Sequence, residues 1–102
     1  MNKQHFLNIL ERRLEQTRAT FYKKNEEYGI GDVFHNFKVA ARIDNTTPIK
    51  ALRGFDLKHR VSVQDMVDNP NIVTEAMIDE KIGDCITYLC ILEGLFREHL
   101  SQ

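Results

Sequence analysis

The chain has 102 residues, enough for one domain with one modest hydrophobic core. Apolar residues make up 42% and charged residues 28%, and the formal net charge of -1 excludes a global field that would attract nucleic acid or a membrane surface. No apolar run approaches the ~20 residues that span a bilayer, and the first residues lack the apolar core of a signal peptide. The two cysteines stand five residues apart in one helical segment and cannot pair. We therefore expect a single soluble domain over residues 1–102, in the cytoplasm.

The first predicted helix runs from about Asn2 to Tyr28 and ends at the glycine that follows. Its apolar residues fall on one narrow stripe. The stripe consists of Phe6, Leu7, Leu10, Leu14, Phe21 and Tyr28. Asp32 is expected to cap a short second helix that ends near Ile43. The second helix should bury Val33, Phe34, Phe37, Ala40 and Ala41.

Two threonines mark the starts of the remaining helices. Thr47 followed by Pro48 is typical of a helix start, so the third helix should run from there to about Asp68. Thr74 followed by Glu75 opens a fourth helix that continues to near the C-terminus. No segment alternates apolar and polar residues over a useful length, so no strand is expected. The pattern predicts an all-α fold of four helices.

The fourth predicted helix has an apolar arc that exceeds half of its circumference when residues are placed at intervals of about 100°. The arc consists of Ile78, Ile82, Cys85, Leu89, Leu92 and Phe96, extended by Met77, Tyr88, Ile91 and Leu95. A helix on the rim of a four-helix monomer needs a stripe of only about 100°. The wide arc therefore predicts a helix that is covered on two sides, for instance by a second subunit, and so a dimer.

A polar line crosses this arc. Asp84 falls inside it, Glu80 lies at its edge one turn earlier, and Tyr88 follows one turn later. A carboxylate on apolar surface needs a partner, because burying an unpaired charge is costly. That partner is a Lys or Arg of a neighbouring helix, a set of capping N–H groups, or a divalent cation held by carboxylates of two facing helices. Oxygen ligands without a Cys/His cluster favour Mg²⁺ or Mn²⁺ over zinc.

The third predicted helix also carries polar residues on its apolar face. One sector contains Leu52, Phe55, His59, Val63 and Met66, and Asp56 joins it beside Ile49 and Val67. His59 therefore faces inward, either as a satisfied core residue or as part of a site. Gly54 in the middle of this helix costs about 1 kcal/mol relative to Ala, which suggests a close helix approach or a ligand nearby.

Lys58, Ser62 and Asp65 form a second polar line on the flank of the same helix. This line is either a solvated face or a phosphate-recognising one, since Lys and Ser both donate hydrogen bonds. Glu26 and Glu27 stand at the end of the first helix, where the helix dipole disfavours negative charge. Their placement is explained either by solvation or by a bound cation.

Four stretches of the sequence resemble a known group of small phage and prophage proteins. They are residues 23–29 (KKNEEYG), 33–37 (VFHNF), 58–66 (KHRVSVQDM) and 80–89 (EKIGDCITYL). The chain resembles the nucleotide-modification-associated domain and, more distantly, the MazG-like all-α nucleotide pyrophosphohydrolases. Members of that superfamily form helical dimers or tetramers, bind Mg²⁺ through acidic helix residues, and cleave nucleoside triphosphates to monophosphate and pyrophosphate.

The resemblance implies a MazG-like four-helix arrangement completed by dimerisation or higher homo-oligomerisation, and a nucleotide-like small molecule as the ligand. It implies Glu27, Glu80 and Asp84 as ligands of Mg²⁺ or Mn²⁺, and Lys58, His59, Ser62 and Tyr88 as ligand-binding residues. The family's second acidic motif reads roughly Glu-Glu-Leu-Gly-Asp, and Lys81 occupies the position of its second glutamate. We therefore expect a nucleotide-like ligand to bind with weak or no pyrophosphohydrolase turnover.

The alternative hypothesis is a non-catalytic phage interaction protein. Such a protein would inhibit or modulate a host factor through a helical surface, in the cytoplasm of the host cell. Binding of Mg²⁺ with a nucleotide separates the two hypotheses, because a native-state ligand raises the melting temperature.

Overall fold

A computed structural model describes residues 1–28 and 31–102, and the side chains of residues 1–23 and 31–102. The chain divides into two compact units, Met1–Ile30 and Gly31–Gln102, and each is described by itself. That the whole chain is a single domain stays a prediction.

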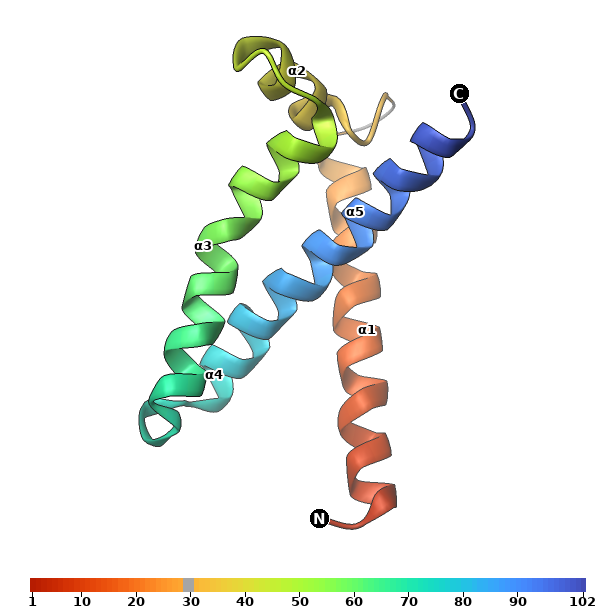
Figure 1. Ribbon diagram of the computed structural model, residues 1–102. Helices are drawn as coiled ribbons and strands as arrows, with labels where there is room; N and C mark the ends of the chain where they lie inside the picture. The colour runs from red at the N-terminus through yellow and green to blue at the C-terminus, as the bar shows by residue number, and fades with distance from the viewer. Residues whose placement is uncertain (29–30) are drawn as a thin grey trace. The chain divides into compact units, whose positions relative to one another are not determined.

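The described residues are helical and contain no strand, as predicted (Figure 1). The elements are α1 (Lys3–Tyr28), α2 (His35–Ile43), α3 (Pro48–Asp68), a 3-10 turn (Pro70–Ile72), α4 (Glu75–Met77), a π-helical segment (Ile78–Ile82) and α5 (Gly83–Leu100). α4, the π-helical segment and α5 follow one another without a break, so together they form the predicted fourth helix. None of the described helices is both long and apolar enough to cross a membrane.

The first unit is α1 alone, and its local hydrogen bonds explain its start. Asn2 caps the helix, because its Oδ1 accepts the backbone N–H of His5 at 2.8 Å. The Gln4 side chain donates to Asn8 Oδ1 one turn later at 2.9 Å. These contacts join residues three or four apart, so they stabilise the helix itself.

The helix starts of the second unit follow the sequence prediction at two of three places. Thr47 Oγ1 accepts the N–H of Lys50, and Thr74 Oγ1 accepts the N–H of Met77, each at 3.2 Å. Asp32 was expected to stand next to α2, but α2 begins only at His35. Asp32 Oδ1 accepts the N–H of Phe34 at 2.9 Å instead. This hydrogen bond spans two residues and builds a turn before the helix, because an Asp side chain competes with helical backbone bonding.

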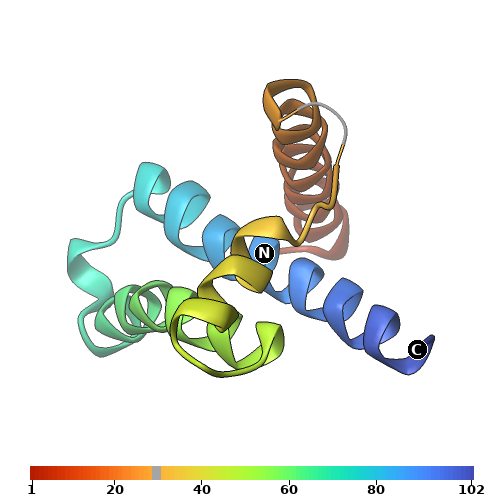
Figure 2. The same cartoon turned by 90° about the horizontal axis from the view of Figure 1, so that it is seen from above.

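The core of the second unit lies where α2, α3 and α5 meet (Figures 1 and 2). Phe37, Leu52 and Leu95 are its buried centre, one from each helix. The partly buried residues packed against them are Phe34, Ile49, Tyr88, Ile91 and Leu92. The Phe37 ring meets the rings of Phe55 and Tyr88 edge to face, at centroid distances of 5.6 and 6.4 Å. Such aromatic pairs add to the gain from buried area alone.

Three apolar residues that were predicted to be buried are exposed. Val33 is 70% exposed because it lies in the turn before α2 rather than in the helix. Phe55 and Val67, on α3, are 45% and 64% exposed. The buried face of α3 is narrower than the predicted sector and centres on Ala51, Leu52, Asp56 and Met66. A short α2 and one neighbouring helix cover only that strip.

The π-helical segment corrects the predicted orientation of residues before Gly83. Its hydrogen bonds span five residues rather than four and widen the turn, so a wheel drawn at a constant α-helical angle misplaces what precedes it. Ile78 was placed in the buried sector but is 40% exposed. Downstream of the segment, Thr87 and Leu95 mark the buried face of α5. Leu89 and Phe96, which were placed in the same arc, are 51% and 47% exposed.

A close helix approach occurs at a different glycine from the predicted one. A Cβ built on Gly54 would meet nothing within 4 Å, so the suggested close contact there is wrong within the described residues. A Cβ on Gly94 would lie 2.8 Å from Phe34 Cζ. Because Gly94 has no side chain, the Phe34 ring lies directly on the backbone of α5. This contact packs the start of α2 against α5.

Candidate functional site

His59, Asp84 and Tyr88 come together between α3 and α5. His59 Nδ1 lies 3.4 Å from Asp84 Oδ2, and the His59 ring lies 4.9 Å from the Tyr88 ring, tilted by 35°. The His59 side chain is 16% exposed and that of Asp84 is 41% exposed. The predicted inward direction of His59 and the one-turn spacing of Asp84 and Tyr88 are both confirmed. The histidine, rather than a Lys or Arg, is the cation-forming partner of Asp84 on the neighbouring helix.

Asp56 is the most deeply buried charged residue of this region. Its side chain is 4% exposed, and its Oδ2 accepts a hydrogen bond from Arg60 Nε at 2.6 Å. Its Oδ1 is buried and has no hydrogen-bond partner among the residues that the structure describes. A buried oxygen without a partner costs about 1–3 kcal/mol, so packing alone gives no reason for an aspartate here.

The carboxylates of Asp56 and Asp84 affect the pKa values of neighbouring side chains. Burial raises the pKa of the Tyr88 hydroxyl, and the negative charges of Asp84 and Asp56 raise it further. Burial also raises the pKa of the Cys85 thiol, with a further rise from Asp56 and an opposing effect of Arg60. The hydrogen bond that Arg60 donates to Asp56 raises the pKa of Arg60. Cys85 is therefore a protonated, weakly reactive thiol at neutral pH, and a nucleophilic role does not suit it.

The predicted metal ligands Glu80 and Asp84 differ in their exposure and in their partners. Glu80 is 66% exposed, and its Oε1 lies 3.3 Å from Lys81 Nζ rather than facing the core with Asp84. Glu80 lies in the π-helical segment Ile78–Ile82, whereas Asp84 lies in the first turn of α5. The side chain of Glu27 lies outside the described residues. Among the residues described, no three His, Cys, Asp or Glu side chains come together around a common point.

The two predicted phosphate-binding residues lie on the exposed flank of α3. Lys58 is exposed, and the Ser62 hydroxyl donates to the Lys58 backbone carbonyl at 3.0 Å. This bond to the preceding turn leaves the hydroxyl oxygen as an acceptor, so Ser62 must give up its own bond to donate to a phosphate. His59, one residue after Lys58, is the part of this line that reaches α5.

Asp56 and Arg60 are coupled to the site by charge, since Asp56 raises the pKa of Tyr88 and both residues affect the pKa of Cys85, but they were not among the predicted site residues. The inward position of Asp56 follows from the helical pattern of α3. The spacing of four residues between Asp56 and Arg60 is also visible in the sequence and is typical of an ion pair on one helix. The unpaired oxygen is not visible there, because it depends on which groups α5 brings close.

A second polar cluster lies near the opposite end of α5. Lys38 Nζ lies 2.5 Å from Asp32 Oδ2 and 2.7 Å from Glu98 Oε1. The hydrogen bond from Lys38 lowers the pKa of Asp32, and both carboxylates raise the pKa of Lys38. One lysine is shared by two carboxylates in this cluster, and the Lys38–Glu98 ion pair joins α2 to α5. Its role is structural.

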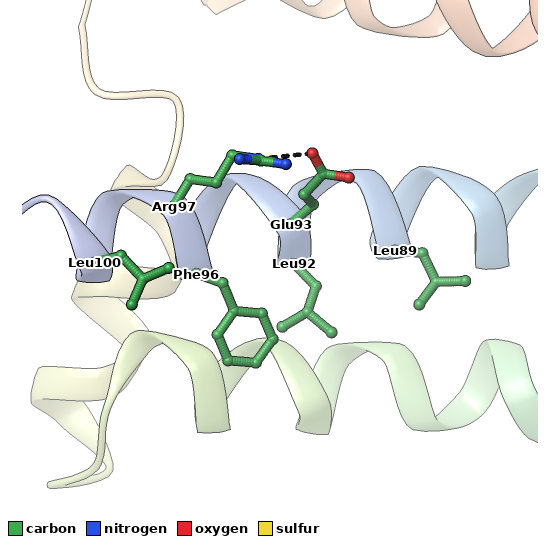
Figure 3. Close-up of a pocket in the computed structure, with 6 residues that line it drawn as sticks. All are labelled: Leu89, Leu92, Glu93, Phe96, Arg97 and Leu100. Atoms are coloured by element: carbon green, nitrogen blue, oxygen red, sulfur yellow. Dashed lines mark hydrogen bonds and ion pairs between the residues drawn. The ribbon is translucent and has the colours of Figure 1, made fainter.

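A shallow apolar groove runs along the exposed side of α5 (Figure 3). It is lined by Leu89, Leu92, Glu93, Phe96, Arg97 and Leu100. In Figure 3 the four apolar side chains project from one side of the helix. Glu93 and Arg97 form an ion pair at its edge, with Oε2 and Nε 2.8 Å apart. The groove is the exposed part of the wide arc that the sequence predicts.

Comparison of the chain with protein-family models, with curated proteins and with solved structures gives no match. The function therefore has to be argued from the residues of the site themselves.

Proposed function

We propose that the protein binds a nucleotide-like phosphorylated small molecule beside the α3–α5 contact. The observation that carries the proposal is the group of ionisable and aromatic side chains there: His59, Asp84, Tyr88, and the Asp56–Arg60 pair with its unpaired oxygen. Buried charge without a structural reason is typical of a functional site. The resemblance of the sequence to nucleotide-modification-associated and MazG-like proteins supports the same ligand class.

The roles follow from the chemistry of each side chain. Lys58 is exposed next to His59 and supplies positive charge for a phosphate. His59 and Tyr88 present a partly exposed pair of rings, against which a base could pack. Asp84 Oδ2 lies 3.4 Å from His59 Nδ1 and so orients the imidazole. Ser62 adds a hydroxyl one turn beyond Lys58.

Mg²⁺ or Mn²⁺ is proposed as an ion that accompanies the phosphate. Mg²⁺ usually keeps several waters and is held by one or two carboxylates together with phosphate oxygens of the ligand. Asp84, which is partly exposed, and Glu80 suit that mode better than they suit a cage made of protein ligands alone. Bound there, the ion would neutralise phosphate charge.

We propose binding with weak or no pyrophosphohydrolase activity. Lys81 contacts Glu80 and thus places a positive charge beside a carboxylate that the hydrolytic reaction would need for metal binding. A MazG-like arrangement completed by dimerisation, a phage-type origin and a location in the cytoplasm are parts of the same proposal. The exposed apolar residues of α1 and α5 support dimerisation.

Thermal unfolding of the full chain with Mg²⁺ and a panel of nucleoside mono- and triphosphates, each alone and combined, tests the proposal. Ligand at about one hundred times its dissociation constant stabilises the native state by about 2.7 kcal/mol, which raises the melting temperature by several degrees. The combination should act at lower concentration than the nucleotide alone. Pyrophosphate release is measured on the same samples and should be weak or absent.

Two variants of α5 form a matched comparison. Asp84→Asn should abolish the thermal shift, because it removes both the proposed cation ligand and the carboxylate beside His59. Glu93→Gln changes a carboxylate of the same helix that pairs only with exposed Arg97, and should keep the shift. Equal shifts in both variants would show that the site is misplaced. Strong pyrophosphate release that disappears in Asp84→Asn would establish an enzyme instead.

The α5 groove favours one second candidate function, a protein that binds and modulates a host factor. Leu89, Phe96 and Leu100 expose 51%, 47% and 81% of their surface along one side of the helix. Contiguous apolar surface of this kind is typical of interaction sites. No thermal shift with any nucleotide, together with loss of host-protein binding in Phe96→Ser, would favour this function over the first.

A further inference from the structure

α1 carries an apolar stripe that is exposed in the single chain. Phe6, Leu7, Leu10 and Leu14 are 57%, 36%, 40% and 54% exposed. The helix spans 26 residues, and its first unit contains no second element against which the stripe could pack. A helix of this length with an uncovered apolar stripe gains most of its stability from packing, so it calls for a partner.

The spacing of the stripe is that of a coiled coil. Leu7, Leu14 and Phe21 recur every seven residues, and Leu10 and Thr17 stand three residues after the first two. They therefore occupy alternating a and d positions, as in two helices packed along a narrow seam. Glu11 and Arg18 then take the e positions beside the seam, and Arg13 takes a g position.

We infer that α1 pairs with α1 of a second copy of this chain, antiparallel, with Glu11 of each copy beside Arg18 of the other. The inference rests on the dimerisation in the proposed function and names its interface. Antiparallel helices bring e positions next to e positions, so the opposite charges of Glu11 and Arg18 attract one another twice. A parallel pair would instead bring Arg13 next to the partner's Arg18, and like charges there repel.

The same charges set the alignment. An antiparallel pair packs a positions against d positions, and the alignment that brings Glu11 beside Arg18 of the other copy sets Leu14 against the partner's Thr17 and Leu10 against the partner's Phe21. The two-fold axis then lies between residues 15 and 16, at the middle of α1 (Lys3–Tyr28), so the two helices overlap along nearly their whole length. Charge and apolar overlap therefore select the same arrangement.

Charge reversal in the full chain tests this interface, with the dimer dissociation constant measured by sedimentation equilibrium. Glu11→Arg and Arg18→Glu should each weaken the dimer by about tenfold, because each turns two attractions into two repulsions. The double variant exchanges the two charges and restores the attraction, so its dissociation constant should return to within about threefold of the parent's. Glu15→Arg and Lys23→Glu reverse exposed charges away from the seam and should change it by less than about threefold.

Each other outcome overturns the inference in a distinct way. Tighter association of Arg18→Glu would indicate a parallel pair. A dimer that none of the reversals affects would place the interface elsewhere and leave dimerisation itself intact. A monomer at high micromolar concentration would remove both the interface and the dimer. The nucleotide proposal is tested separately by the thermal shift of Asp84→Asn, so it stands or fails independently.

Discussion

α1 and the unit formed by residues 31–102 differ in where their side chains find partners. In α1 the hydrogen bonds of Asn2 with His5 and of Gln4 with Asn8 join residues three or four apart, and its leucines are exposed. In the second unit, contacts join different helices, as in His59–Asp84 and Lys38–Glu98. Amphipathic patterning thus forms a helix in both regions, but only the second combines helices into a core. The folded stability of the single chain should therefore reside mainly in residues 31–102.

A leucine-to-alanine pair tests that difference most directly. Leu52 is 2% exposed at the centre of the core, so Leu52→Ala should lower the free energy of unfolding by about 2–5 kcal/mol. Leu14→Ala in α1 removes the same atoms from an exposed position, and should cost less than about 0.5 kcal/mol when the protein is dilute enough to be monomeric. Urea unfolding followed by circular dichroism measures both. Equal losses would show that α1 is part of the cooperative core.

The Asp56–Arg60 pair sharpens the comparison, because it places a charge inside the second unit. Arg60→Met removes the partner of a buried carboxylate and should lower the free energy of unfolding by about 3 kcal/mol. Asp56→Leu removes the unpaired oxygen, while Arg60 remains near water, so stability should stay level or rise by about 1–2 kcal/mol. Differential scanning calorimetry gives both values. A large loss in Asp56→Leu would mean that the aspartate stabilises the fold.

The two mid-helix glycines show where the second unit is closely packed. Gly54→Ala meets open space and should stabilise the protein by about 1 kcal/mol through helix propensity. Gly94→Ala would press on the Phe34 ring and should destabilise it by about 1–2 kcal/mol. The same chemical change thus has opposite signs on α3 and α5, which melting temperatures can show. Adding Phe34→Leu should relieve the Gly94→Ala defect.

The smallest expected effect is on how the stability of the protein depends on pH in acid. Since Lys38 lowers the pKa of Asp32, the folded state binds a proton there less readily than the unfolded state. This contribution to stability is present above the ordinary pKa of 3.8 and is lost as the pH falls through the lowered value. Asp32→Asn should therefore reduce the dependence of the urea midpoint on pH below about 4. The Asp32 side chain is 40% exposed, so solvent screening keeps the difference small.

Most of the fold could be predicted because its signals are local. Thr47 and Thr74 cap helices through their own hydroxyls, and apolar spacing gives the lengths of α1 and α3. The turn at Asp32 was missed by a few residues, since its side chain bonds two residues ahead instead of capping a helix. Packing at Gly94 could not be predicted, because it depends on Phe34, which lies 60 residues earlier in the sequence.

The candidate site could be predicted only in part. Spacing predicted that His59 faces inward and that Asp84 and Tyr88 share one face of their helix, but it did not predict that the three side chains meet. Glu80 was placed in line with Asp84 and Tyr88 on the assumption of regular winding, but it lies in the π-helical segment and is 66% exposed. The unpaired oxygen of Asp56 could not be foreseen, because periodicity tells which residues face inward but not which polar atoms they meet.

The π-helical segment Ile78–Ile82 also affects how insertions and deletions should be tolerated. A segment wound with five-residue hydrogen bonds holds more residues per turn than the α-helix that continues it. Removing one residue within it could be absorbed by a return to regular winding, with the register of α5 unchanged. Removing one residue from the middle of α5 would turn the rest of that helix by about 100° and carry Leu95 away from Leu52. Natural variants of this chain that differ in length by one residue should therefore have the gap at residues 78–82.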